Sequence, residues 1–264
     1  MSRTIPEGLA PILEDLELNR PQLVSLADLR TMCERHHIGT EPRVVALRLK
    51  QRGWLVATPQ RGVWEFAPAE LAGPYTSADP LLPLKAFNIA HPGCRNALCG
   101  QSAAWALGLA DRVPSTISVV FEEWPKVKTP SELTAATFTP QARVRSTRGV
   151  SALGPASIVV QMAERPSAVR SWQSAIEWLP DVAFEIDESE LLKELKGRPS
   201  SVAQRTGYLL QGLRPDLAAA VADAYTARTT VRMGAAEDPI RYDREWMVSD
   251  ALLPFDPKEL ETVK

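Results

Sequence analysis

The stretch that decides the N-terminal fold is residues 40–66, TEPRVVALRLKQRGWLVATPQRGVWEF. Its first part predicts a short helix, because Thr40 suits the N-cap, Pro42 suits the first turn and Gly53 suits the position after a helix end. The second part is rich in β-branched and aromatic residues and is interrupted at residues 59–62 by Pro-Gln-Arg-Gly. This pattern predicts two strands joined by a turn. A basic helix followed by a β-hairpin is therefore expected.

Two further helices are expected before this stretch. Apolar residues at helical spacing predict a first helix that opens near Pro6. These residues are Leu9, Ile12, Leu13 and Leu16. A second helix is expected to start after an N-cap at Ser25, with Asp28 three residues on, and to end at Gly39. Three helices followed by a hairpin predict a winged helix.

The rest of the chain predicts a larger mixed domain, so the expected fold class is α+β. The predicted organisation is a winged-helix DNA-binding domain at 1–70, a Pro- and Gly-containing linker at 71–84 and a mixed α/β domain at 85–264. In the last of these, a helix ending at Gly108 precedes the strong strand pattern TISVVFEEW. Weaker strand patterns follow around residues 133–138, 142–150 and 246–248, and helical patterns fill the segments between 157 and 229.

Positive charge is concentrated in one segment, although the formal net charge of the 264 residues is −2. Between residues 43 and 62 the sequence holds five cations and no acid. These cations are Arg43, Arg48, Lys50, Arg52 and Arg61. A local cationic surface is what the phosphates of duplex DNA require, and we expect Arg61 to contact the backbone from the tip of the hairpin.

The periodicity of the basic helix divides its residues between two faces. Val45, Ala46 and Leu49 share one face and are expected to pack on the first two helices. Four residues are expected to face outward: Val44, Leu47, Arg48 and Gln51. Arg and Gln side chains can read base edges in the major groove, so Arg48 and Gln51 are the candidate base-reading residues. Val44 and Leu47 could contact thymine methyl groups or pack against a neighbour.

The sequence offers little material for catalysis. It lacks the phosphate-binding patterns GxxxxGK[ST] and GxGxxG, and its three histidines and three cysteines do not combine at zinc-ligand spacing. We therefore expect no catalytic residue, no metal and no cofactor. The acidic and basic residues of ESELLKEL and RYDREW are expected to form solvent-exposed ion pairs.

Location and redox state follow from similar reasoning. The chain shows no secretory leader, and no apolar run approaches the roughly 20 residues that span a bilayer. The odd number of cysteines, Cys33, Cys94 and Cys99, favours reduced thiols. A cytoplasmic protein without a membrane segment is the expectation.

The ordered set of segments resembles the AbiEi-type antitoxins of bacterial toxin–antitoxin systems. The segments are LRLKQRGWLVATPQRGVWEFAP (47–68), GQSAAWALGL (100–109), ISVVF (117–121) and QRTGYLLQGL (204–213). The resemblance implies a winged helix that binds inverted repeats in its own promoter and represses it. It also implies a C-terminal domain that counteracts a nucleotidyltransferase-like toxin, with Tyr208, Leu209 and Leu210 in its core. Trp64 stands where the wing of this family commonly has tyrosine.

Two other functions stay open at this point. The chain could be a winged-helix transcriptional regulator whose larger domain senses a small ligand, which would require a pocket of convergent polar groups. It could also be an enzyme with an accessory DNA-binding module, which would require a cluster of perturbed titratable groups.

Overall fold

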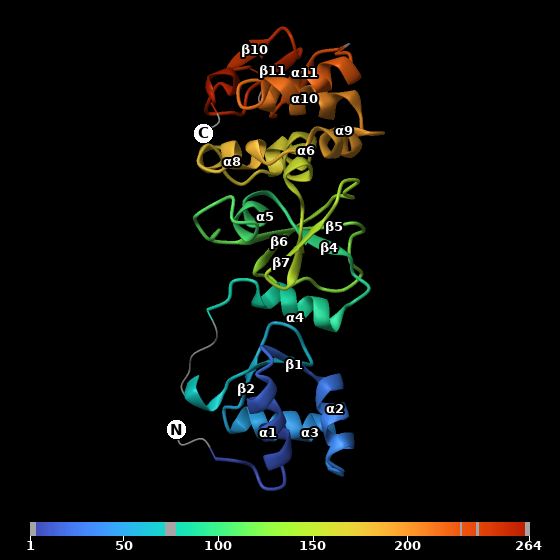
Figure 1. Cartoon of the computed structure of the whole chain (residues 1–264), viewed down its shortest axis with the longest axis vertical. Coiled ribbons are helices and arrows are strands. Elements are labelled where there is room, and N and C mark those ends of the chain that lie inside the picture. The colour runs from blue at the N-terminus through green and yellow to red at the C-terminus, as the bar shows by residue number, and fades with distance from the viewer. Residues whose placement is uncertain (1–3, 72–77, 228, 236–237, 262–264) are drawn as a thin grey trace. The chain divides into compact units, whose positions relative to one another are not determined.

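The structure is a computed structural model that describes residues 4–71, 78–227, 229–235 and 238–261 (Figure 1). The chain divides into two compact units. The first unit comprises Met1–Cys94 and Lys126–Leu133, and the second comprises Arg95–Pro125 and Thr134–Lys264. This is the expected α+β arrangement, in which a small helical unit with a short sheet precedes a larger mixed unit.

The first unit begins with three helices, α1 (Ala10–Asn19), α2 (Leu26–Arg35) and α3 (Pro42–Gln51). The predicted N-cap of α2 is confirmed. The Ser25 hydroxyl accepts a hydrogen bond from the Asp28 backbone N–H, and the Asp28 carboxylate accepts one from the Ser25 backbone N–H. This reciprocal arrangement satisfies two N–H groups at the helix start that have no partner within the helix.

Two predicted helix boundaries are wrong. α2 ends at Arg35 instead of continuing to Gly39, because His37 takes the left-handed conformation (φ 54°) that stops the helix. Thr40 does not cap α3. The N-cap is Glu41, which makes no side-chain cap hydrogen bond. At the other end of α3, Gly53 has the positive φ (77°) expected of a residue that follows a helix.

The helices are joined to a sheet with the strand order β1-β3-β2. β2 (Leu55–Ala57) and β3 (Val63–Phe66) pair antiparallel and confirm the predicted hairpin. β1 (Leu23–Ser25) was not predicted, and it pairs antiparallel with β3, with Val24 opposite Trp64. The hairpin is therefore fixed to the segment that leads directly into α2.

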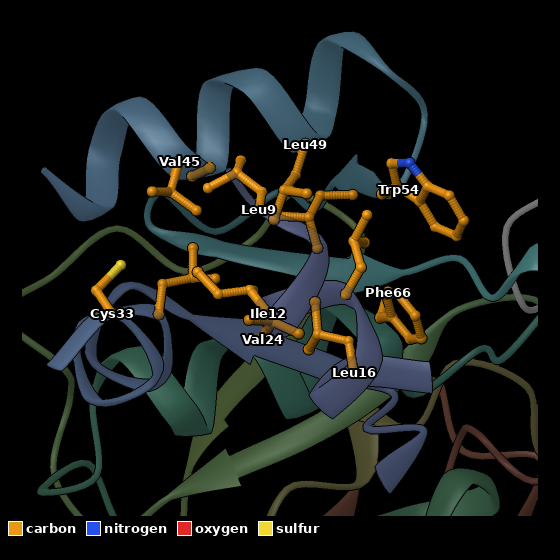
Figure 2. Packing of buried hydrophobic residues seen from close by; sticks show 13 residues of the cluster. Leu9, Ile12, Leu16, Val24, Cys33, Val45, Leu49, Trp54 and Phe66 are labelled. Atoms are coloured by element: carbon orange, nitrogen blue, oxygen red, sulfur yellow. The ribbon is translucent and has the colours of Figure 1, made fainter. Parts of the chain in front are cut away.

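One hydrophobic core holds these elements together (Figure 2). Val45 and Leu49 point from α3 toward Leu9, Ile12 and Leu16, as predicted from the helical spacing. Val24, Cys33 and Phe66 add contributions from β1, α2 and β3, and the Trp64 side chain packs on the cluster while half-buried. Burial of apolar side chains at this density fixes the rotation of α3 about its own axis.

The first unit extends beyond the segment expected to be a linker. After a 3₁₀ turn (Ala69–Leu71), α4 (Leu82–Ala90) packs on β1 and β3. Lys85 bonds to the Asp79 carboxylate at 2.8 Å and to the Gln22 side-chain oxygen at 2.9 Å. The compact unit thus includes α4, whereas the sequence placed the start of the second domain at residue 85.

The second unit begins with a sheet of strand order β6-β5-β4-β8-β7. Its strands are β4 (Asn96–Leu98), β5 (Ile117–Phe121), β6 (Leu133–Thr137), β7 (Arg145–Thr147) and β8 (Val150–Ala152). β4 pairs antiparallel with β5 and parallel with β8. α5 (Gly100–Ala106) packs on β4 and β5, and Gly108 follows it with a positive φ, as predicted.

Helices fill the middle of this unit (Figure 1). They are α6 (Pro155–Glu164), α7 (Trp172–Ala175), α8 (Leu179–Phe184), α9 (Glu188–Leu195), α10 (Ser200–Leu210) and α11 (Pro215–Ala224), with a 3₁₀ turn at Pro166–Ala168. α6 is almost wholly buried and packs against α5, α8, α9 and α10. It therefore forms the centre of the second unit, and its hydrophobic run in the sequence reflects burial on all sides.

A small sheet of order β10-β11-β9 packs on α10. Its strands are β9 (Val231–Met233), β10 (Arg241–Asp243) and β11 (Val248–Asp250), and a 3₁₀ turn (Pro257–Glu259) follows. Gly207 of α10 lies directly against the Trp246 ring, where an added Cβ would be 2.0 Å from the nearest ring atom. Tyr208, Leu209 and Leu210 are buried, as the resemblance implied.

The expectation of solvent-exposed ion pairs is wrong for two of the acids. Glu194 of ESELLKEL is fully buried and accepts hydrogen bonds from the backbone N–H groups of Gln141 and Ala142, from the Ser157 hydroxyl and from Arg198. Asp243 of RYDREW is also buried. It accepts from the Trp246 backbone N–H and pairs with Lys258. Each of these carboxylates therefore connects separate segments of the fold and is not a solvent-exposed group on a helix surface.

Candidate nucleic-acid interface

The outward face of α3 has the composition that the sequence predicted. Val45, Ala46 and Leu49 are buried, which turns the opposite side of the helix to solvent. The residues exposed on α3 and at its end are Arg43, Val44, Leu47, Arg48, Lys50, Gln51 and Arg52. Leu47 is 54% exposed, so this leucine is not part of the core. Cationic, amide and apolar groups are thus presented together on the second helix of a helix-turn-helix, the position from which such helices enter the major groove.

The hairpin supplies a second cationic position. Arg61 is exposed in the turn between β2 and β3, and Gly62 beside it has a positive φ of 81°. The Thr58 hydroxyl crosses the base of this turn and donates to the Val63 backbone carbonyl at 2.8 Å. The turn is therefore an ordered support for Arg61, as expected of a wing that contacts the sugar–phosphate backbone.

Two contacts hold the hairpin in place. The Leu26 backbone N–H donates to the Gly62 carbonyl at 2.9 Å, which connects the turn to the start of α2. The side chain of Gln60 lies 2.9 Å from His91 Nε2, just after α4. The sequence did not predict this contact. No local pattern could reveal it, because the two residues are far apart in the chain.

The charges on this surface are largely unpaired. Among the residues that the structure describes, no carboxylate forms an ion pair with Arg43, Arg48, Lys50 or Arg61. Arg52 donates to the Thr4 hydroxyl at 2.8 Å, a neutral partner that leaves its charge uncompensated. Cations without protein partners keep their full charge for an external anion such as a DNA phosphate.

Three acids of this unit lie in different environments. Glu41, at the N-cap of α3, is exposed, whereas Glu65 in β3 is buried. Asp15 of α1 is paired with Arg35 at 2.9 Å and with His36 at 2.8 Å. The hydrogen bond from His36 is the main cause that holds the pKa of Asp15 below its usual value. The Asp15 carboxylate is thus neutralised by cations of its own helical bundle.

The described residues show no assembly of groups suited to metal binding. In the ranges that the structure covers, no three His, Cys, Asp or Glu side chains lie close enough to hold a metal ion. Burial raises the pKa of the Cys99 thiol to about 12 and also raises that of Cys33, so both thiols are neutral near pH 7. Over the same ranges, no helix is both long enough and apolar enough to cross a membrane.

Comparison with known proteins relates the chain to one protein family and to a solved structure. The family model of the AbiEi antitoxin C-terminal domain matches residues 96–212. The crystal structure of the RV2827C protein from Mycobacterium tuberculosis is similar to the chain, with a TM-score of 0.79 and 27% sequence identity over 96% of this chain and 94% of that chain. No curated protein sequence matches. The match of residues 96–212 to the AbiEi antitoxin C-terminal domain confirms the resemblance found in the sequence.

Proposed function

We propose that the chain is a DNA-binding antitoxin with one task in each unit. The winged helix binds inverted repeats in the promoter of its own toxin–antitoxin operon and represses it. The second unit counteracts a cognate nucleotidyltransferase-like toxin. The match of residues 96–212 to the AbiEi antitoxin C-terminal domain supports the antitoxin task.

The observation that carries the DNA-binding task is the set of exposed, unpaired cations on α3 and the wing. Arg48 and Gln51 project from α3 on the side opposite its buried residues, where they are available to base edges. Arg43, Lys50, Arg52 and Arg61 surround them and are proposed to contact phosphates. A local patch of this kind binds DNA even when the net charge of the chain is −2, because DNA phosphates interact mainly with nearby charges.

An electrophoretic mobility shift with the upstream DNA of the operon tests this task. We expect Arg48→Ala and Arg61→Ala each to weaken binding, the former by about 1–3 kcal/mol if it reads a base. Arg61→Ala should weaken binding to all DNA sequences alike. It should also make the slope of log K against log salt shallower by about one unit, because one phosphate contact is lost. Arg112→Ala is the matched control, because it removes an exposed arginine of the second unit. Unchanged shifts for both wing and helix variants would refute the proposed surface.

Co-expression with the adjacent gene product tests the antitoxin task. When the toxin is expressed from an independent promoter, wild-type chain should restore growth. The full-length double variant Arg48→Ala/Arg61→Ala should restore growth equally well but fail to repress a reporter driven by its own promoter. Loss of rescue in a folded double variant would contradict the division of tasks between the two units.

A further inference from the structure

A polar pocket lies within the AbiEi domain, between the start of α5, the loop before β5, α6 and the segment around α7. Its volume is about 80 Å³. Its lining includes six hydroxyl side chains: Ser102, Ser115, Thr116, Ser118, Ser171 and Ser174. Gln161, Arg170 and Trp178 complete the polar part of the wall, and Met162 and Val169 are among its apolar residues.

Two side chains in this wall, Gln161 and Trp178, carry N–H donors without a hydrogen-bond partner among the described residues. Gln161 is only 7% exposed, yet no hydrogen bond among the described residues involves its side-chain amide. Trp178 is 3% exposed, and its indole Nε1–H is buried without a hydrogen-bond partner in the described part of the chain. An unsatisfied buried donor costs about 1–3 kcal/mol. A ligand with acceptor atoms would remove this cost at Trp178 and would give the Gln161 amide a partner.

The charge of the lining restricts the chemistry of such a ligand. Arg170 lines the pocket from an exposed position, and it forms no ion pair with the described acids. The lining contains no Asp or Glu, and Cys99 at its wall is a neutral thiol. Unpaired N–H donors, hydroxyl groups and a single cation favour an acceptor-rich anion over a cation.

The volume of the pocket limits the size of the ligand that it can hold. A volume of about 80 Å³ has room for a few waters or for a group of that size. Pockets that enclose drug-sized ligands are several times larger, at about 300 Å³ or more. The pocket therefore suits a small oxyanion or the terminal phosphate of a larger molecule, but not a whole nucleoside.

We propose that this pocket of the AbiEi domain binds a phosphate group, either as free phosphate or as part of a nucleotide. In the proposed complex, Gln161 and Trp178 donate hydrogen bonds to phosphate oxygens and Arg170 neutralises their charge from the rim. Ser115, Thr116 and Ser118 are placed to add hydroxyl contacts. This inference is independent of DNA binding and adds a ligand to a domain otherwise known by its antitoxin match.

Calorimetric titration of the full chain with inorganic phosphate, and separately with ATP, tests the proposal. We expect saturable binding of at least one of them, accompanied by an increase in Tm. Arg170→Ala should weaken that binding by about tenfold, since it removes a charge-assisted contact. Gln161→Leu keeps the size of the side chain and should weaken binding without changing the charge. The indole N–H resonance of Trp178, assigned with Trp178→Phe, should shift on titration.

The control is Arg143→Ala, which removes an exposed arginine outside the pocket lining. Binding of phosphate but not ATP would identify free oxyanion as the ligand, and the reverse would identify a nucleotide phosphate. Absence of binding by both ligands to folded chain would overturn the proposal. So would equal weakening by Arg170→Ala and Arg143→Ala. Because Arg170 is exposed, its variant is expected to fold even if Gln161→Leu does not.

Discussion

Some arginines of the first unit and some of the second differ in whether the protein supplies them with a partner. On α3 and the wing, Arg43, Arg48 and Arg61 are exposed and form no ion pair with the described residues. In the second unit, Arg198 contacts Glu164, Glu194 and the Thr139 carbonyl, and lies over the Phe138 ring. The same side chain thus serves as a free charge in one place and as a structural connector in the other.

A second connector shows the same principle in the C-terminal sheet. Arg241 bonds to the Asp250 carboxylate at 2.7 Å and to the backbone carbonyls of Leu253 and Phe255. Tyr208 donates to the same carboxylate at 2.9 Å, and burial, followed by the charge of Asp250, raises the pKa of this tyrosine. Buried polar groups are retained when all members of the network are satisfied. A cation that is surrounded in this way is not available to an external anion.

The largest expected effect is on the buried network of Glu194. Glu194→Ala would leave Arg198 without its buried partner and would orphan the N–H groups of Gln141 and Ala142. We expect the free energy of unfolding to fall by about 3–5 kcal/mol, as measured by urea denaturation. Glu190→Ala on the same helix removes a less buried acid that lies 3.5 Å from Arg145, so it should cost about 1 kcal/mol or less. Equal losses would break the contrast between connector and surface charges.

An intermediate effect is expected at Arg43, and it should appear in DNA binding alone. Arg43→Ala removes an exposed, unpaired side chain, so the free energy of unfolding should change by less than about 0.5 kcal/mol. Operator affinity should fall by a few-fold, and the slope of log K against log salt should become shallower by about one unit. Fluorescence anisotropy at several salt concentrations measures both quantities. A stability loss comparable to that of Glu194→Ala would show that Arg43 is another connector.

The smallest expected effect concerns the ion pairs of Asp15 in α1 with Arg35 and His36 at the end of α2. Because the pKa of Asp15 is lowered by His36 and Arg35, its charged form stabilises the folded state. This contribution is fully present above the unfolded pKa, which is about 4, and is lost as pH falls through the lower folded pKa. The difference in unfolding free energy between wild type and Asp15→Asn should be below about 1 kcal/mol at pH 5 and should shrink toward pH 2. A difference that grows on acidification would contradict this assignment.

Strong local patterns made several elements predictable. The apolar spacing of α1 and α3, the Ser25 cap and the strand pattern of β5 each depend on residues close together in the chain. Other elements were missed because their cause is distant. β1 has only three residues and exists through its pairing with β3, and the buried position of Glu194 depends on the segment containing Gln141 and Ala142.

The two candidate sites also differ in whether their cause is local in the sequence or depends on distant residues. The cations of α3 and the wing were chosen from the sequence, because an acid-free basic stretch and helical periodicity are local properties. The pocket around Gln161 was not predicted from the sequence. Its wall joins residues between Cys99 and Trp178 that become neighbours only in the folded unit. Nothing about a single glutamine in a hydrophobic helix indicates that its amide has no partner.

By itself, the sequence determined the three helices and the β2–β3 hairpin of the winged helix, which residues α3 turns inward, and where positive charge is concentrated. These properties are set by backbone preferences and by the periodic burial of apolar side chains, which act over a few residues. Only the tertiary structure decided which charges remain free, which are neutralised by distant partners, and where buried donors converge. Hydrogen bonds and ion pairs depend on three-dimensional distance, and that distance is set by packing of the whole unit.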